Sequence, residues 1–146
     1  MRLNTVPEET HAVLVGIGSY PHDPERLSPI PAIRNNIHAL KRILTNDEIA
    51  GIPAPNITTI IDELSFPNVD VAVREAAESA KETLIVYYAG HALAGNDRKL
   101  YLAVSGTTEK RFEKNALPFE NLVESLDTSA AKRKILVLDC RFAGKV

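Results

Sequence analysis

The chain has 146 residues, 45% of them hydrophobic and 25% charged, which is the composition of an ordinary globular domain. This length fits one domain, residues 1–146, with a single sizeable core. A net charge of −2 gives no field that favours nucleic acid, and no apolar run is long enough to span a membrane.

Four short apolar runs, rich in β-branched and aromatic residues, predict strands. Because none of them alternates cleanly with polar residues, each suits a strand covered on both faces, as in a parallel sheet. In chain order they are Ala12–Ile17, Ile57–Ile61, Thr83–Ala89 and Ile135–Leu138.

Apolar residues at helical spacing lie between these runs. They predict helices over Ala32–Thr45, Asn68–Glu82 and Phe119–Leu126. Pro31 suits the first turn of the first helix. The segment Lys99–Val104 reads as a small extra strand or hairpin, and the proline-rich segments 20–31 and 50–56 read as loops. This alternation predicts an α/β fold, a three-layer sandwich with a mostly parallel sheet and helices on both faces.

Functional residues of such sheets gather beyond the carboxyl ends of the strands. The third predicted strand ends in Gly90-His91, and the fourth ends in Asp139-Cys140. If these strands are neighbours, His91 and Cys140 leave the sheet at the same edge. A thiolate is a nucleophile and an imidazole can exchange its proton, so the pair is a candidate for acyl transfer.

Supporting residues are expected close to this pair. Gly90 would let the chain turn sharply, and backbone N–H groups after the histidine, at Ala92, would bind an oxyanion. The remaining histidines are expected to be structural or solvated, and no two residues show the spacing of a zinc site. We therefore expect neither metal nor cofactor. Since Cys140 is the single cysteine, no internal disulfide can form, and a reducing cytoplasm is the expected compartment.

Several segments resemble those of caspase-like cysteine peptidases, including bacterial members and metacaspases, and above all the type associated with bacterial effectors. Leu84-Ile-Val-Tyr-Tyr-Ala-Gly-His91 resembles the strand that carries their catalytic histidine. Lys134-Ile-Leu-Val-Leu-Asp-Cys-Arg-Phe-Ala-Gly144 resembles their nucleophile strand. In caspases the histidine lies about 50 residues before the cysteine, and here the interval from position 91 to 140 is 49. Residues 12–18 and 31–40 resemble the family's first strand and first helix.

Three positions depart from the family pattern. Ala92 stands for the glycine after the catalytic histidine, and Ala143 for the serine of the nucleophile motif. Aligning on Asp139 and Gly144, which matches more residues, puts Arg141 at the nucleophile position; aligning on the Cys-Arg pair leaves Cys140 there. Since adjacent side chains on a strand point opposite ways, only one of the two faces His91.

The resemblance implies further roles and partners. Asp139 would line the primary specificity pocket and favour cleavage after Arg or Lys, and Asp23 is a second candidate acid for that pocket. The chain would be the large-subunit portion of such a domain, without the small-subunit strands. Its partners would be a peptide or protein substrate, the small subunit or C-terminal remainder of the same protein, and an attached effector domain, with no nucleic acid and no membrane.

Three hypotheses follow. The first is a cysteine endopeptidase that uses His91 and Cys140 and cleaves after a basic residue. The second is a non-catalytic caspase-like module for partner binding or regulation, with Arg141 in place of the nucleophile. The third is a flavodoxin-like or nucleotide-binding α/β domain, which the strand–helix alternation permits. The turn Gly16-Ile-Gly18 adds only a weak signal, because it lacks the third glycine of a phosphate loop.

Overall fold

The structure, a computed structural model, describes residues 6–143. Its strands are β1 (Thr10–Gly16), β2 (Ile57–Ile61), β3 (Thr83–Ala94), β4 (Leu100–Leu102), β5 (Leu117–Pro118) and β6 (Arg133–Phe142). Its α-helices are α1 (Ala32–Thr45), α2 (Phe66–Ser79), α3 (Phe112–Asn115) and α4 (Phe119–Thr128). Short 3-10 turns cover Pro7–Glu9, Ala54–Asn56 and Glu109–Arg111.

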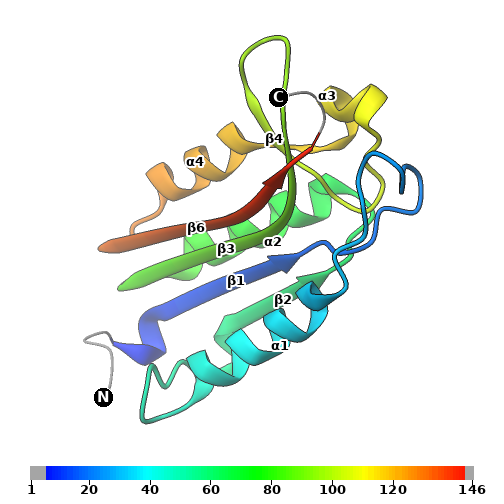
Figure 1. The fold of residues 1–146 in the computed structure, drawn as a ribbon. Coiled ribbons are helices and arrows are strands. Elements are labelled where there is room, and N and C mark those ends of the chain that lie inside the picture. The colour runs from blue at the N-terminus through cyan, green and yellow to red at the C-terminus, as the bar shows by residue number, and fades with distance from the viewer. Residues whose placement is uncertain (1–5, 144–146) are drawn as a thin grey trace.

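The centre of the fold is a parallel sheet with the strand order β2-β1-β3-β6 (Figure 1). Strand β3 is the longest and pairs with β1 on one side and β6 on the other. Beyond the end of β1, the last residues of β3 pair with the antiparallel β4, which in turn pairs with β5. The long β3 therefore joins the main sheet to a small antiparallel extension at its carboxyl end.

Helices cover both faces of this sheet (Figure 1), as the sequence predicts. Helix α1 buries Ile33, Ile37 and Leu44 on one face, against β1 and β2. Helices α2 and α4 pack on the opposite face and enclose the larger core with apolar residues of β1 and β3. The expected three-layer α/β sandwich is confirmed, and α1 has the predicted bounds.

Two expectations about the strands are wrong. Strand β3 continues through Gly90 and His91 to Ala94, because Lys99–Val104 supplies β4 as an antiparallel partner for this end. Strand β6 is exposed along much of its length instead of being covered on both faces. Helix α1 packs on β1 and β2, so Ile135 and Val137 remain 45% and 41% exposed on that face of β6.

Candidate functional site

His91 lies inside β3, not after it, and is only 6% exposed. Its backbone N–H donates to the hydroxyl of Tyr20 at 3.0 Å, and its carbonyl accepts the N–H of Ala103 at 2.9 Å. The hydroxyl of Tyr88 donates to the carbonyl of Ala103 at 2.7 Å, and it lies 3.0 Å from the carbonyl oxygen of His91. Both backbone groups of His91 are thus fixed by buried partners.

The imidazole of His91 is held in one orientation. Its Nε2 lies 2.8 Å from the carbonyl oxygen of Ser28, and its ring centroid lies 4.9 Å from that of Tyr20. Because a carbonyl oxygen only accepts hydrogen bonds, this contact assigns the ring proton to Nε2. The lone pair of the neutral ring is then on Nδ1, which is buried and has no hydrogen-bond partner among residues 6–143. Nδ1 is therefore the ring atom available to accept a proton.

Tyr20 closes a gap in the sheet beside the histidine. Just after β1, the N–H of Ile17 donates to the carbonyl of Ala89, and just after β4, the N–H of Ala103 donates to the carbonyl of His91. Between these two points the Tyr20 hydroxyl accepts the His91 N–H and donates to the carbonyl of Ile17 at 2.8 Å. Burial is the largest cause that raises the pKa of Tyr20 to about 12, so this phenol keeps its proton.

Gly90 serves close packing, not the sharp turn expected from the sequence, since β3 runs straight through it. A Cβ atom at this position would lie 2.5 Å from the hydroxyl oxygen of Tyr88 and 2.7 Å from that of Tyr20. Both hydroxyls are buried and hydrogen-bonded, so neither has room to withdraw. The absence of a side chain at Gly90 is what admits the two phenols behind His91.

The register of β3 and β6 brings Arg141 to the histidine. His91 is the Cα partner of Arg141, and Gly90 is the partner of Cys140. Residues paired in this way on parallel strands extend to the same face of the sheet. Arg141 is exposed and makes no hydrogen bond or ion pair with other residues in the range 6–143. Its guanidinium is thus unengaged on the face that His91 occupies.

Cys140 lies on the opposite face. It packs with Leu136 and Leu138 against the core that α2 and α4 enclose, and it is half-buried. Burial, with a smaller contribution from the charge of Asp139, raises the pKa of the Cys140 thiol to about 11. A nucleophilic cysteine needs the reverse, a lowered pKa. Sequence reasoning placed Cys140 and His91 at one edge, and they are there, but on different faces.

The structure separates the two candidate acids. Asp139 shares a face with Arg141, two residues along β6, and its Oδ2 accepts the hydroxyl of Tyr87 at 3.2 Å. Asp23 instead accepts the backbone N–H of Glu109 at 2.8 Å and so anchors the loop after β1. The geometry gives Asp23 a structural contact and leaves Asp139 exposed near Arg141.

Ala92, the expected oxyanion donor, is fully buried within the sheet. It is in register with Leu102 of β4 on one side and Phe142 of β6 on the other, and its carbonyl accepts the N–H of Ala143 at 2.9 Å. Ala143 thus continues the pairing of β6 with β3 by one residue. Gly144, on which one alignment of the nucleophile motif rests, lies outside the described residues.

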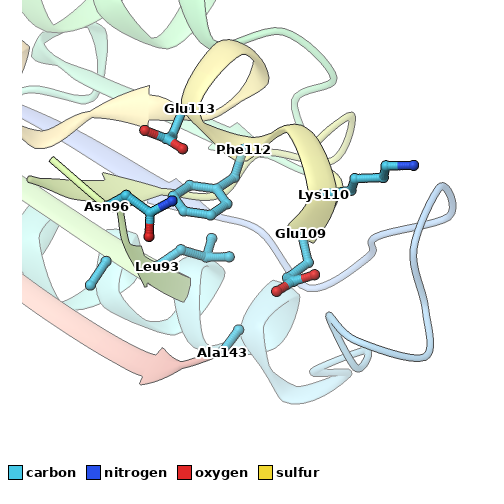
Figure 2. A pocket seen from close by; sticks show the side chains of 8 residues that line it. Leu93, Asn96, Glu109, Lys110, Phe112, Glu113 and Ala143 are labelled. Carbon is cyan, nitrogen blue, oxygen red and sulfur yellow. The ribbon is translucent and has the colours of Figure 1, made fainter. Parts of the chain in front are cut away.

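A cavity of about 410 Å³ adjoins this edge. Figure 2 shows Glu109, Lys110, Phe112 and Glu113 on one wall, with Leu93 and Ala143 on the other. Leu93 and Ala143 lie two residues beyond His91 and Arg141, so the cavity begins where the paired strands end. The lining of this cavity therefore carries two glutamates and one lysine.

Among residues 6–143, no three His, Cys, Asp or Glu side chains are grouped so that they could hold a metal ion. None of the helices in this range is both long and apolar enough to cross a bilayer. Sequence reasoning missed Tyr20 and Ser28, whose contacts with His91 are 71 and 63 residues apart in the chain. No local pattern around either residue signals these contacts.

The chain was compared with known families and with curated proteins. No curated protein matches it. A family model described as the caspase domain matches residues 9–145, which is nearly the whole sequence and includes every strand of the sheet. This match agrees with the histidine strand, the nucleophile-like strand and the parallel α/β sandwich. The chain therefore belongs to the caspase domain family of cysteine peptidases.

Proposed function

We propose that this chain is a caspase-family domain that binds peptide or protein ligands at the carboxyl edge of its sheet without cleaving them. The observation that carries this proposal is the register of β3 and β6, which pairs Arg141 with His91 and turns Cys140 to the other face. The family implies a peptide or protein as the ligand. The alternative is a peptidase in which His91 and Cys140 form the catalytic dyad.

The chemistry of the two residues favours the non-catalytic role. An arginine guanidinium remains protonated at any physiological pH and cannot attack a carbonyl. The thiol of Cys140 is protonated near neutral pH, because its pKa is raised to about 11. A nucleophile also has to lie within hydrogen-bond reach of its base, and the register directs Cys140 away from His91.

Asp139 supports a preference for ligands with a basic residue. Its carboxylate is exposed on the face of His91 and Arg141, and within residues 6–143 it accepts a hydrogen bond from the neutral hydroxyl of Tyr87. An Arg or Lys side chain of a ligand would complement this charge. The domain would then keep a basic specificity of the kind expected from the family resemblance, and apply it to binding.

The exposed strand β6 supports the proposed partners. Ile135 and Val137 form an apolar strip on one face of β6, and the outer edge of β6 pairs with no other described strand. Additional strands, from a small subunit or from further residues of the same protein, would extend the sheet here and cover that edge. An effector domain joined to this chain would then be governed by ligand binding.

An assay for lost and restored cleavage tests the proposal. The protein is incubated under reducing conditions with a peptide that carries a reporter group after an Arg residue. We expect no turnover by the unaltered protein or by Cys140→Ala. Adding Arg141→Cys to Cys140→Ala puts a thiol opposite His91 and should raise turnover by roughly 100-fold over background, as expected when a nucleophile gains a base.

Two outcomes contradict the proposal. Turnover by the unaltered protein that disappears in both His91→Ala and Cys140→Ala would establish the peptidase alternative. A folded Arg141→Cys variant without any gain, even with Ala143→Ser added, would remove the argument that Arg141 occupies the place of a nucleophile.

A further inference from the structure

We propose that His91 and Arg141 together form a carboxylate site that takes the free C-terminus of a peptide. This inference rests on the proposed function and specifies its ligand. The partners in register across β3 and β6 supply two different kinds of hydrogen-bonding group to one face. One is an exposed cation and the other is a buried ring nitrogen without a partner.

Arg141 provides the charge. Its guanidinium is exposed and has no hydrogen bond or ion pair with residues 6–143, so none has to be broken when a ligand binds. The planar fork of N–H donors matches the two oxygens of a carboxylate. An arginine that replaces a nucleophile thus converts a site that would act on a carbonyl into one that holds the acid produced from it.

His91 provides a buried atom that lacks a partner. The residue is 6% exposed, its Nε2 is bound to the carbonyl of Ser28, and its Nδ1 has no partner in the described residues. Because the Ser28 contact and the Tyr20 ring hold the imidazole, the ring cannot turn to satisfy Nδ1 elsewhere. A buried polar atom left without a hydrogen bond costs about 1–3 kcal/mol, which a ligand group can recover.

A carboxylate offers Nδ1 no hydrogen atom, so binding requires a proton. The ring takes one proton from solvent at Nδ1, becomes an imidazolium, and donates to the carboxylate that Arg141 also binds. One proton is therefore taken up for each ligand bound, and no covalent bond changes.

The neighbouring titratable groups do not supply that proton change. They are Tyr20, whose ring packs on the imidazole, Tyr88, whose hydroxyl bonds the His91 carbonyl, and three residues of the paired strand β6, namely Asp139, Arg141 and, on the opposite face, Cys140. Burial raises the pKa of both tyrosines and of Cys140 far above neutrality, and the guanidinium stays charged. An imidazole is the side chain in this group that ordinarily gains a proton between pH 5 and 8.

Asp139 favours a C-terminus over a more highly charged anion. It places a negative charge two residues from Arg141 on the same face, which opposes a phosphate dianion more than a single carboxylate. The same charge attracts the side chain of a terminal Arg or Lys. The ligand of best fit is therefore a peptide that ends in a basic residue with a free carboxylate, which is the N-terminal product of cleavage after that residue.

Calorimetry with matched peptides tests the inference. One peptide ends in Arg with a free carboxylate, a second is the same peptide as its C-terminal amide, and a third is an amide with an internal Glu. We expect the acid to bind at least tenfold more tightly than either amide, a difference of about 1.4 kcal/mol. Repeating the titration in two buffers of different ionisation enthalpy should give an uptake of one proton.

Variants assign the effect to the two residues. Arg141→Gln should remove the preference for the acid, while Arg42→Gln, at an exposed position on α1, should keep it. His91→Phe should abolish proton uptake, provided that its circular dichroism matches that of the unaltered protein. Since His91 is buried and this variant risks misfolding, the imidazole nitrogen resonances of the unaltered protein provide a second measurement, in which Nδ1 should become protonated upon binding.

The outcomes separate this inference from the proposed function. Equal affinity for acid and amide would overturn the carboxylate site and leave peptide binding intact, and equal affinity for the Glu peptide would overturn the assignment to a C-terminus. Enthalpies independent of buffer, with unchanged Nδ1 resonances, would overturn the role of His91. Failure of every peptide to bind, or cleavage of the peptides detected by mass spectrometry, would overturn the proposed function itself.

Discussion

The position of His91 depends on two phenols that have no part in any proton transfer. Tyr20 and Tyr88 bond its backbone from within the core, and Gly90 leaves the room that they need. Each hydroxyl satisfies backbone groups that the ends of β1 and β4 leave open. The side chain of Tyr20 thus completes the hydrogen bonding of the sheet beside His91. Its contribution to the site can be measured as a change in the free energy of unfolding.

Removing the Tyr20 hydroxyl tests this role. Tyr20→Phe leaves the N–H of His91 and the carbonyl of Ile17 buried without a partner, so we expect a loss of about 1–3 kcal/mol in the free energy of unfolding. Tyr87→Phe removes a phenol that bonds the exposed Asp139 and should cost less than about 0.5 kcal/mol. Urea denaturation monitored by circular dichroism measures both. Equal losses of unfolding free energy in the two variants would show that the hydroxyl of Tyr20 stabilises the fold no more than the exposed one of Tyr87.

The thiol of Cys140 should be unreactive at ordinary pH. A thiol reacts as its anion, and the folded-state pKa of about 11 keeps Cys140 protonated until the pH approaches that value. At pH 8 we expect alkylation by iodoacetamide to be roughly 100-fold slower than for a thiol of pKa about 9, since two pKa units separate their anion fractions. The rate should rise through pH 10–11 and become fast in urea. Rapid labelling of folded protein at pH 7 would instead indicate an activated cysteine.

At the scale of elements, β6 has two faces of different kinds. Leu136, Leu138 and Cys140 pack against the core on one face, while Ile135 and Val137 are exposed on the other. This edge strand thus carries apolar residues that residues 6–143 do not cover. An apolar strip beside an open strand edge promotes association.

Paired substitutions on the two faces should separate these roles. Leu138→Ala removes core contacts from a half-buried residue and should cost about 2 kcal/mol. Val137→Thr, at a position 41% exposed, should change the free energy of unfolding by less than about 0.5 kcal/mol. It should also lower self-association of the chain in sedimentation experiments. If Val137→Thr were as destabilising as Leu138→Ala, β6 would be covered on both faces in solution.

At the scale of the whole molecule, the sheet divides the apolar side chains into two cores, and this architecture could be predicted from the sequence. The spacing of Ile33, Ile37 and Leu44 gave the bounds of α1, because helical periodicity is a local signal. The exposure of β6 could not be predicted, because it depends on which strand lies at the edge of the described sheet. The length of β3 was also missed, since its last residues depend on pairing with β4.

In the candidate site, too, some features could be predicted from the sequence and others could not. Of the two alignments of the motif around Asp139, one puts Arg141 and the other Cys140 at the nucleophile position, and which of them applies stays a prediction; the register pairs Arg141 with His91. The contacts of Tyr20 and Ser28 could not be predicted, because each joins residues more than 60 positions apart through a loop without periodicity. A motif identifies candidate site residues, whereas the loop contacts that orient them appear only in the structure.

The loop after β1 is tied to His91 at two points: the phenol of Tyr20 accepts its backbone N–H, and the carbonyl of Ser28 accepts the N–H of its imidazole. Between them, Asp23 and Leu27 are also anchored and Arg26 forms an ion pair with Glu109, whereas Pro24 and Glu25 are exposed. Insertions in homologous chains should therefore accumulate at positions 24 and 25, where a longer loop can extend into solvent while the anchored residues on either side stay in place. Such insertions would change which peptides this edge of the sheet recognises, while His91 would stay in the same position.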